Sequence, residues 1–357
     1  MKSHYPQKGL PVTLPYIHTF RGIAIIFIVL GHALYFQFDW SEHTFAFNLL
    51  KDVLSNGTVL FVFISGYLFK HLHGRYTLSS YYKNKFKNLV LPYLILSVPA
   101  IAFTVLVAPS FSQLAVFHSE SITLQVLSHY LVGGAHVNYA LWFMPMIIVV
   151  ILLAPLLATI FSSPQRYWLV LPLLVLSLLI HRSPVPIVDV PRHVIYFIPV
   201  FIIGMWVNDC RDQVEGWLER NCFGLLLVVL ALIAYQFNFA DYHGSLLTEQ
   251  AFDNKRWLFD FELIQKLLFC GLFIGLLRRY ESLNLRVFDI LARYSFTIFF
   301  CHIYIFVLIE IIVGHQQVEG NVLLWMLRAL IALSMCCLIG FIGQKLFGRY
   351  SRQIVAS

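Results

Sequence analysis

Residues 18–34 read HTFRGIAIIFIVLGHAL, an apolar stretch typical of a membrane helix, with Arg21 near its start and His32 near its end. At 100° per residue, the offset of eleven positions equals three helical turns plus about 20°, so both side chains share one face, roughly 16 Å apart along the axis. Ionisable groups inside a membrane helix are costly and indicate a functional site that faces the bundle interior. In the alternative interpretation, Arg21 anchors the helix at the interface and His32 is a hydrogen-bonded packing residue.

The composition is that of an integral membrane protein. Of the 357 residues, 59% are hydrophobic and 12% are charged, whereas soluble proteins carry about 25% charged residues. Apolar runs recur along the whole length, so we expect a single membrane domain over residues 1–357, with no fused soluble domain. No cleavable signal peptide is visible, because the N-terminus is polar up to Pro15 and no small-residue cleavage site follows the first apolar run.

We expect an all-α, polytopic bundle of about ten helices in the lipid bilayer. Windows long enough to cross a hydrocarbon core of about 30 Å lie at 17–37, 47–71, 89–108, 138–161, 167–182, 192–208, 222–239, 257–278, 292–313 and 321–347. With the N-terminus in the cytoplasm, the cytoplasmic side collects eighteen Lys and Arg residues and the outer side five. This positive-inside bias predicts that both termini are cytoplasmic, with Arg21 at the cytoplasmic edge and His32 deeper in the membrane.

The charge and the cysteines argue against a nucleic-acid partner, a metal site and a disulfide framework. The net charge of +7 follows from the topology, so we predict no nucleic-acid partner. The six cysteines show no CxxC or other metal-ligand spacing, and most lie inside apolar runs, where a free Cys behaves as a small hydrophobic residue. We therefore predict no metal site, no disulfide framework and no bound cofactor.

Three lysines, Lys83, Lys85 and Lys87, occupy alternate positions just before the third apolar window. They are either plain positive-inside anchors or an electrostatic dock for an anionic cytosolic substrate, since Lys binds phosphate as a point charge. A nucleotide-bearing acyl donor such as coenzyme A fits the second interpretation.

Further polar or aromatic side chains are candidates for a substrate cavity: Ser65, Tyr67, Trp142, Asp260 and His302. Each also has a structural interpretation. Small residues such as Ser65 permit close helix approach, and Trp142 is typical of an interfacial belt. Asp260 either pairs with Arg256 four positions earlier or binds sugar hydroxyls near the outer mouth. His302 is a substrate or relay group, or a packing residue.

Taken together, these segments resemble the acyltransferase-3 family of membrane O-acyltransferases. The resemblance rests on Arg21 and His32 with ten residues between them, the FISGYL run at 63–68, the basic stretch that leads to Pro92, the LWFMP segment at 141–145, and the Tyr-Ser…His segment that ends at His302. These motifs follow the family's order and span about residues 15–305.

The resemblance implies transfer of an acyl group, often acetyl from acetyl-CoA as co-substrate, to a carbohydrate hydroxyl of a cell-surface glycan, in a bacterial cytoplasmic (inner) membrane. His32 matches the family's essential histidine and Arg21 its paired basic residue. The family commonly has an Arg-x-x-Arg pair where this chain has alternating lysines, and Lys cannot reproduce bidentate Arg contacts. The fused esterase-like domain of some members is absent, so a second transfer step would need a separate periplasmic transferase.

The chemistry suits a histidine base, because His has a pKa near neutrality and can take the proton of an attacking hydroxyl. We expect direct attack of the sugar hydroxyl on the thioester, although Ser65 or Cys301 would be candidates for an acyl-enzyme. The main alternative is a transporter or flippase for a lipid-linked sugar or polysaccharide unit, which uses the same polar cavity without chemistry. A non-catalytic scaffold does not explain the paired Arg21 and His32.

Overall fold

The computed structural model describes residues 14–36, 38–107, 121–134, 136–185, 188–252, 259–283, 285–314 and 317–357. These residues are overwhelmingly helical, and the predicted all-α bundle is confirmed. The only strands among them are β1 (Phe38–Asp39) and β2 (Val318–Glu319), which pair in parallel.

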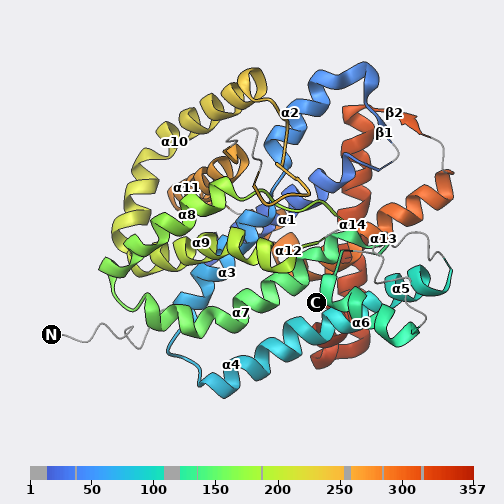
Figure 1. Cartoon of the computed structure of the whole chain (residues 1–357), viewed down its shortest axis with the longest axis horizontal. Helices are drawn as coiled ribbons and strands as arrows, with labels where there is room; N and C mark the ends of the chain where they lie inside the picture. The colour runs from blue at the N-terminus through green and yellow to red at the C-terminus, as the bar shows by residue number, and fades with distance from the viewer. Residues whose placement is uncertain are drawn as a thin grey trace.

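Along the chain, the described elements are mainly helices (Figure 1). The first half consists of α1 (Pro15–Ala33), η1 (Ser41–His43), α2 (Thr44–Leu54), α3 (Thr58–Leu72), α4 (Leu78–Lys85), the π-helical turn η2 (Phe86–Val90), α5 (Leu91–Leu106), α6 (Ile122–Val132), the 3-10 turn η5 (Tyr139–Trp142), α7 (Phe143–Ile160), η6 (Pro164–Leu169) and α8 (Val170–Leu179). The second half consists of α9 (Val190–Asp209), α10 (Arg211–Phe239), α11 (Phe261–Arg279), α12 (Arg286–Arg293), α13 (Ser295–Val313), α14 (Val322–Phe347), η7 (Gly348–Tyr350) and α15 (Ser351–Ile354).

The predicted number of ten membrane helices is not confirmed. Within the described residues, eight helical segments are long and apolar enough to cross a membrane. The two remaining predicted helices correspond to the segment Pro164–Leu179, which is shorter, and to α11, which is not among the eight. Helix α11 carries Glu262 and Lys266 in its first two turns, which lowers its hydropathy although both side chains are fully buried.

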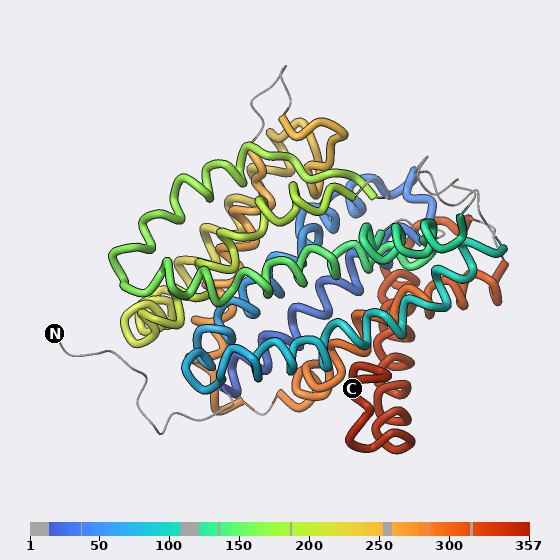
Figure 2. The backbone as a smooth tube through the Cα atoms, turned by 60° about the horizontal axis from the view of Figure 1, so that its bottom comes forward, coloured from blue at the N-terminus to red at the C-terminus, as the bar shows by residue number. Residues whose placement is uncertain are grey.

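Helix α1 lies in the interior of the bundle and packs against α3, α11, α12, α13 and α14 (Figure 2). Gly22 lets α1 approach α12, because a Cβ at this position would collide with the backbone of Phe288. Helices α3 and α9 meet in the same way: a Cβ at Gly66 would collide with the Phe201 backbone, and one at Gly204 with the Phe63 carbonyl. Small residues at such crossings are the usual means of close packing inside a membrane.

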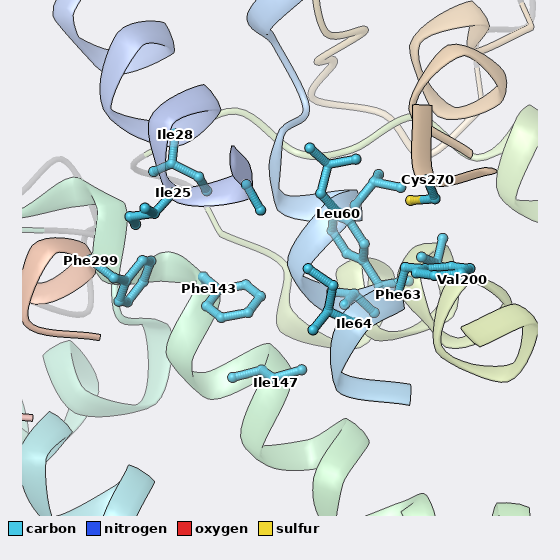
Figure 3. Packing of buried hydrophobic residues seen from close by; sticks show 14 of the residues in the cluster. Ile25, Ile28, Leu60, Phe63, Ile64, Phe143, Ile147, Val200, Cys270 and Phe299 are labelled. Atoms are coloured by element: carbon cyan, nitrogen blue, oxygen red, sulfur yellow. The ribbon is translucent and has the colours of Figure 1, made fainter. Parts of the chain in front are cut away.

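An apolar core joins α1, α3, α7, α9, α11 and α13 (Figure 3). Ile25 from α1, Phe63 from α3 and Phe143 from α7 are at most 8% exposed. Arg21 and His32 lie near opposite ends of α1, so their side chains have separate surroundings.

Candidate active site

His32 and His302 form a hydrogen-bonded pair between α1 and α13. The Nδ1 atom of His32 lies 2.7 Å from Nε2 of His302, and the two ring planes are nearly parallel, with centroids 5.0 Å apart. His302 is fully buried, and its Nδ1 lies 2.9 Å from the carbonyl oxygens of both Ile298 and Phe299. The structure thus brings together the two intramembrane histidines that are 270 positions apart in the sequence.

The direction of these hydrogen bonds assigns the tautomers. Carbonyl oxygens only accept, so Nδ1 of His302 carries the hydrogen and its Nε2 is the acceptor. His32 therefore donates from Nδ1, which leaves Nε2 of His32 with a lone pair that can take a proton. The assignment is inferred from the network of neighbours, as it is for histidines in general.

The ring of Tyr139, on η5, stands edge-on to His32 with centroids 5.4 Å apart. The turn is fastened to α13 by Asn138, whose Nδ2 donates to the carbonyl of Phe300 at 2.9 Å. Asn138 and Tyr139 lie just before the LWFMP segment, separated from it by Ala140, but local sequence alone gives no signal that they meet a histidine of the first helix.

At the basic end of the bundle, a cavity of about 720 Å³ opens between α1, α3, the α4–α5 region, α7, α13 and α15. Its cationic lining residues are Arg21, Lys85 and Arg352, and His18 lies beside them. No Asp or Glu is among the described residues that line it. The remaining walls are mostly apolar, with polar atoms supplied by Ser65, Asn84, Asn88 and Ser295.

Arg21 is held by the end of α12. Its Nη2 donates to the carbonyl of Ala292 at 2.7 Å and lies 3.4 Å from Nδ1 of His18. Its buried Nε has no hydrogen-bond partner among the described residues. Arg21 reaches Ala292 and His32 reaches His302, so both side chains point to the same side of α1, as their spacing predicts.

The inner wall of the cavity approaches the histidine pair. Phe143 and Phe299 both line the cavity, and their rings meet edge-to-face with centroids 5.4 Å apart (Figure 3). The Phe299 ring also lies 6.5 Å from the ring of His302. The Phe299 ring therefore connects the inner wall of the cavity to His302, and neither histidine is among the described residues that line the cavity.

Of the three lysines, only Lys85 lines the cavity, while Lys83 and Lys87 are exposed and do not. Among the predicted substrate-cavity residues, Ser65 is the one that lines this space. Tyr67 instead donates to Glu215 and lies 2.9 Å from the hydroxyl of Tyr16.

Trp142 and Asp260 lie outside this cavity, near the fully buried Tyr196 of α9. Asp260 accepts from the Tyr196 hydroxyl at 2.7 Å and caps α11 by accepting from the Leu263 amide at 3.0 Å. The expected partner Arg256 lies outside the described residues. The ring of Trp142 faces the guanidinium of Arg182 at 6.0 Å, and Arg182 also lies 5.4 Å from the ring of Tyr196.

Arg352 and Arg182 were not among the residues singled out from the sequence. Arg352 lies beyond the last apolar window and Arg182 at the end of the fifth, positions that are typical of charges at a membrane boundary. Within the described part of the chain, no group of three or more His, Cys, Asp or Glu side chains is arranged to hold a metal ion.

A family model described as an acyltransferase domain matches residues 14–343. This range includes Arg21, both histidines of the pair and Lys85, and it ends before Arg352. No curated protein and no solved structure matches the chain.

Proposed function

The chain belongs to the acyltransferase-3 family, and from this membership in a family of membrane acyltransferases we propose that it moves acetyl from acetyl-CoA to a hydroxyl of a cell-surface or lipid-linked carbohydrate. One observation carries the proposal: a cavity with cations and no lining carboxylate extends to the aromatic wall beside the His32–His302 pair. An anionic donor suits the cations, and a general base suits the histidine pair.

The donor would lie with its phosphates at the basic end of the cavity, beside Arg21 and Lys85. Arg21 offers an unused buried Nε, and Lys85 offers a point charge. The acyl-bearing arm would run along the apolar wall formed by Ile17, Ile64 and Phe143. Its thioester would then reach the aromatic wall nearest to His302.

The transfer step needs a base and a leaving thiolate. The sugar oxygen attacks the thioester carbonyl carbon while Nε2 of His32 takes the hydroxyl proton. A C–O ester bond forms, the C–S bond breaks, and the proton passes from His32 to the leaving thiolate, which restores the neutral imidazole. General-base catalysis of this kind contributes about 10²–10⁴-fold to the rate.

His302 acts as a positioning residue. By accepting the Nδ1 hydrogen of His32, it fixes the tautomer in which Nε2 of His32 is free to take a proton. The carbonyls of Ile298 and Phe299 hold the His302 ring in turn. When His32 becomes an imidazolium, its hydrogen bond to His302 strengthens, because charge-assisted hydrogen bonds are stronger than neutral ones.

The acceptor would approach from the side of η5, opposite the basic cavity. Tyr139 contacts His32, and Trp142 on the same turn contacts Arg182 and His193. Arg182 is only 5% exposed, and its guanidinium lies over the ring faces of Trp142, Tyr196 and Phe197. Arg192 is similarly buried, but its guanidinium has hydrogen-bond acceptors. It donates to the backbone carbonyls of His181, Thr248, Glu249 and Gln250.

This arrangement also offers a solution to the sidedness of the reaction. The positive-inside bias predicts that the Arg21 end is cytoplasmic, where acetyl-CoA is found. We propose that a carbohydrate acceptor on the outer face of a bacterial cytoplasmic membrane reaches His32 past η5. The histidine pair would then be the point at which the two substrates meet.

The test is acetyl transfer by the purified protein. Incubation with labelled acetyl-CoA and glycan should label the glycan, and His32→Ala should lower the rate about 10²–10⁴-fold while expression and thermal unfolding stay near those of the parent. His71→Ala is the matched control, because His71 is a buried histidine of α3 outside the cavity lining. Acetylation at the parental rate by well-folded His32→Ala would remove the proposal, and glycan movement without labelling would favour a transporter.

A further inference from the structure

We propose that Arg352, on the short helix α15, binds a phosphate group of the acyl-CoA donor together with Arg21 and Lys85, so that a segment beyond the family-matched range completes the donor site. The inference rests on the proposed function. It assigns a specific task to residues 344–357, which lie outside the matched domain at 14–343.

Three cations converge on one cavity from three separate elements. Arg21 comes from α1, Lys85 from the end of α4, and Arg352 from α15. The charge of Arg352 acts repulsively on both Arg21 and Lys85. Since no described lining residue carries a negative charge, this repulsion is relieved when an anion enters the cavity.

The position of Arg352 is fixed by the segment that carries it. After α14, the chain turns back and lies against α5 and α14 (Figure 2). Thr297 of α13 donates to the carbonyl of Val355 at 2.9 Å, and a Cβ at Gly343 of α14 would collide with the Val355 side chain. Ser351 is 5% exposed and donates to the carbonyl of Ser357 at 2.9 Å.

Helix α13 contacts the segment that carries Arg352 and also supplies residues of the cavity and of the histidine pair. Ser295, at the start of α13, lines the cavity, Thr297 anchors Val355, and His302 lies further along. Arg352 is thus placed relative to the histidine pair through one continuous helix, and it faces the cavity mouth as an exposed side chain.

Arg352 has no carboxylate partner within ion-pair distance in the described parts of the chain. Arg349, three positions earlier, is different: it donates to the hydroxyl of Tyr350 at 2.8 Å, lies 4.8 Å from that ring, and does not line the cavity. A guanidinium can hold phosphate with two parallel hydrogen bonds, which the ammonium of Lys85 cannot do. Arg352 therefore adds a bidentate contact for phosphate at this end of the cavity.

The experiment measures acetyl-CoA binding to the purified full chain by calorimetry, in discs of zwitterionic lipid. Arg352→Gln should raise the Kd about tenfold, as expected for loss of a charge-assisted hydrogen bond, and Arg352→Lys should recover part of the loss. Arg349→Gln is the matched control and should bind like the parent. Thermal unfolding of all variants should coincide, because neither arginine is buried.

A second donor separates phosphate binding from a general effect on the cavity. S-acetylpantetheine lacks the nucleotide phosphates, so Arg352→Gln and the parent should bind it equally. Equal weakening for both donors, or parental affinity of Arg352→Gln for acetyl-CoA, would overturn the inference. So would loss of acetyl-CoA binding on adding anionic lipid, which would show that a lipid phosphate is the ligand. Failure of the parent protein itself to bind acetyl-CoA would instead contradict the proposed function.

Discussion

Two groups of charged side chains in the protein differ in how their charges are matched. The first is the basic cavity, where Arg21, Lys85 and Arg352 face a space without a lining carboxylate. The second, here called the acidic network, joins α2, α10 and α11 through Asp52, Gln236, Glu262, Gln265 and Lys266, all of them fully buried.

In the acidic network, the groups of the protein satisfy one another. Asp52 accepts from the Gly244 amide at 2.8 Å and lies 2.9 Å from Nδ1 of His243. Lys266 forms an ion pair with Glu262 at 2.9 Å, and Gln236 donates to both Asp52 and Glu262. Fully satisfied networks of this kind fix a unique packing, whereas the cations of the cavity lack such partners. The comparison teaches that the buried charges of the acidic network pair within the protein, whereas the cations of the cavity face no lining carboxylate.

The largest effect is expected when a substitution breaks the acidic network. Lys266→Met leaves the carboxylate of Glu262 buried without its cation, so stability should fall by about 3–5 kcal/mol, the usual cost of breaking a buried pair. Thermal unfolding in detergent measures the loss. Adding Glu262→Gln should recover much of it. If Lys266→Met unfolds like the parent but no longer transfers acetyl, the network belongs to the reaction and the contrast with the cavity is wrong.

An intermediate effect is expected at the histidine pair, where position matters more than charge. His302→Ala removes the acceptor that fixes the tautomer of His32, and should lower kcat about 10–100-fold, as loss of an orienting partner does at metal-bound histidines. The KM for acetyl-CoA should not change. His302→Asn keeps an acceptor oxygen and should restore part of kcat. Equal kcat values for the Ala and Asn variants would contradict the positioning role.

The smallest effect is expected at the lysines of the α4 region, and it tests whether the donor binds inside the cavity. Because only Lys85 of the three lysines lines it, Lys85→Gln should raise the KM for acetyl-CoA a few-fold, about 1 kcal/mol for a partly exposed charge. The effect should shrink at high salt. The double variant Lys83→Gln with Lys87→Gln is the control and should leave KM unchanged. A larger rise in the KM of the double variant would indicate that the donor binds on the outside of α4 and not in the cavity.

The helices could be predicted largely from hydropathy, because a membrane helix must satisfy its backbone hydrogen bonds internally and present apolar side chains along its length. The uncertain members of the predicted ten show the limit of this rule. Helix α11 contains the charged residues Glu262 and Lys266, which form an ion pair with each other. Both are fully buried, and the partner of Glu262 on α10, Gln236, cannot be identified from the sequence window of α11.

The site could be predicted in part for the same reason. Helical periodicity placed Arg21 and His32 on one side of α1, but the partner of His32 is 270 positions away. The direction of the Tyr67 hydroxyl depends on Glu215 of α10, and Asp260 serves as a helix cap that also binds Tyr196. Each of these contacts is decided by packing between distant helices.

The separation of the two histidines has a consequence for biosynthesis. At about 5–20 residues per second, the ribosome adds His302 roughly 15–50 s after His32. During that interval α1 enters the bilayer with its imidazole unmatched by its final partner, and six of the eight candidate membrane spans lie before α13. The His32–His302 pair can therefore form only late in insertion, after these earlier spans, so a nascent chain that stalls before α13 carries His32 without its hydrogen-bond partner.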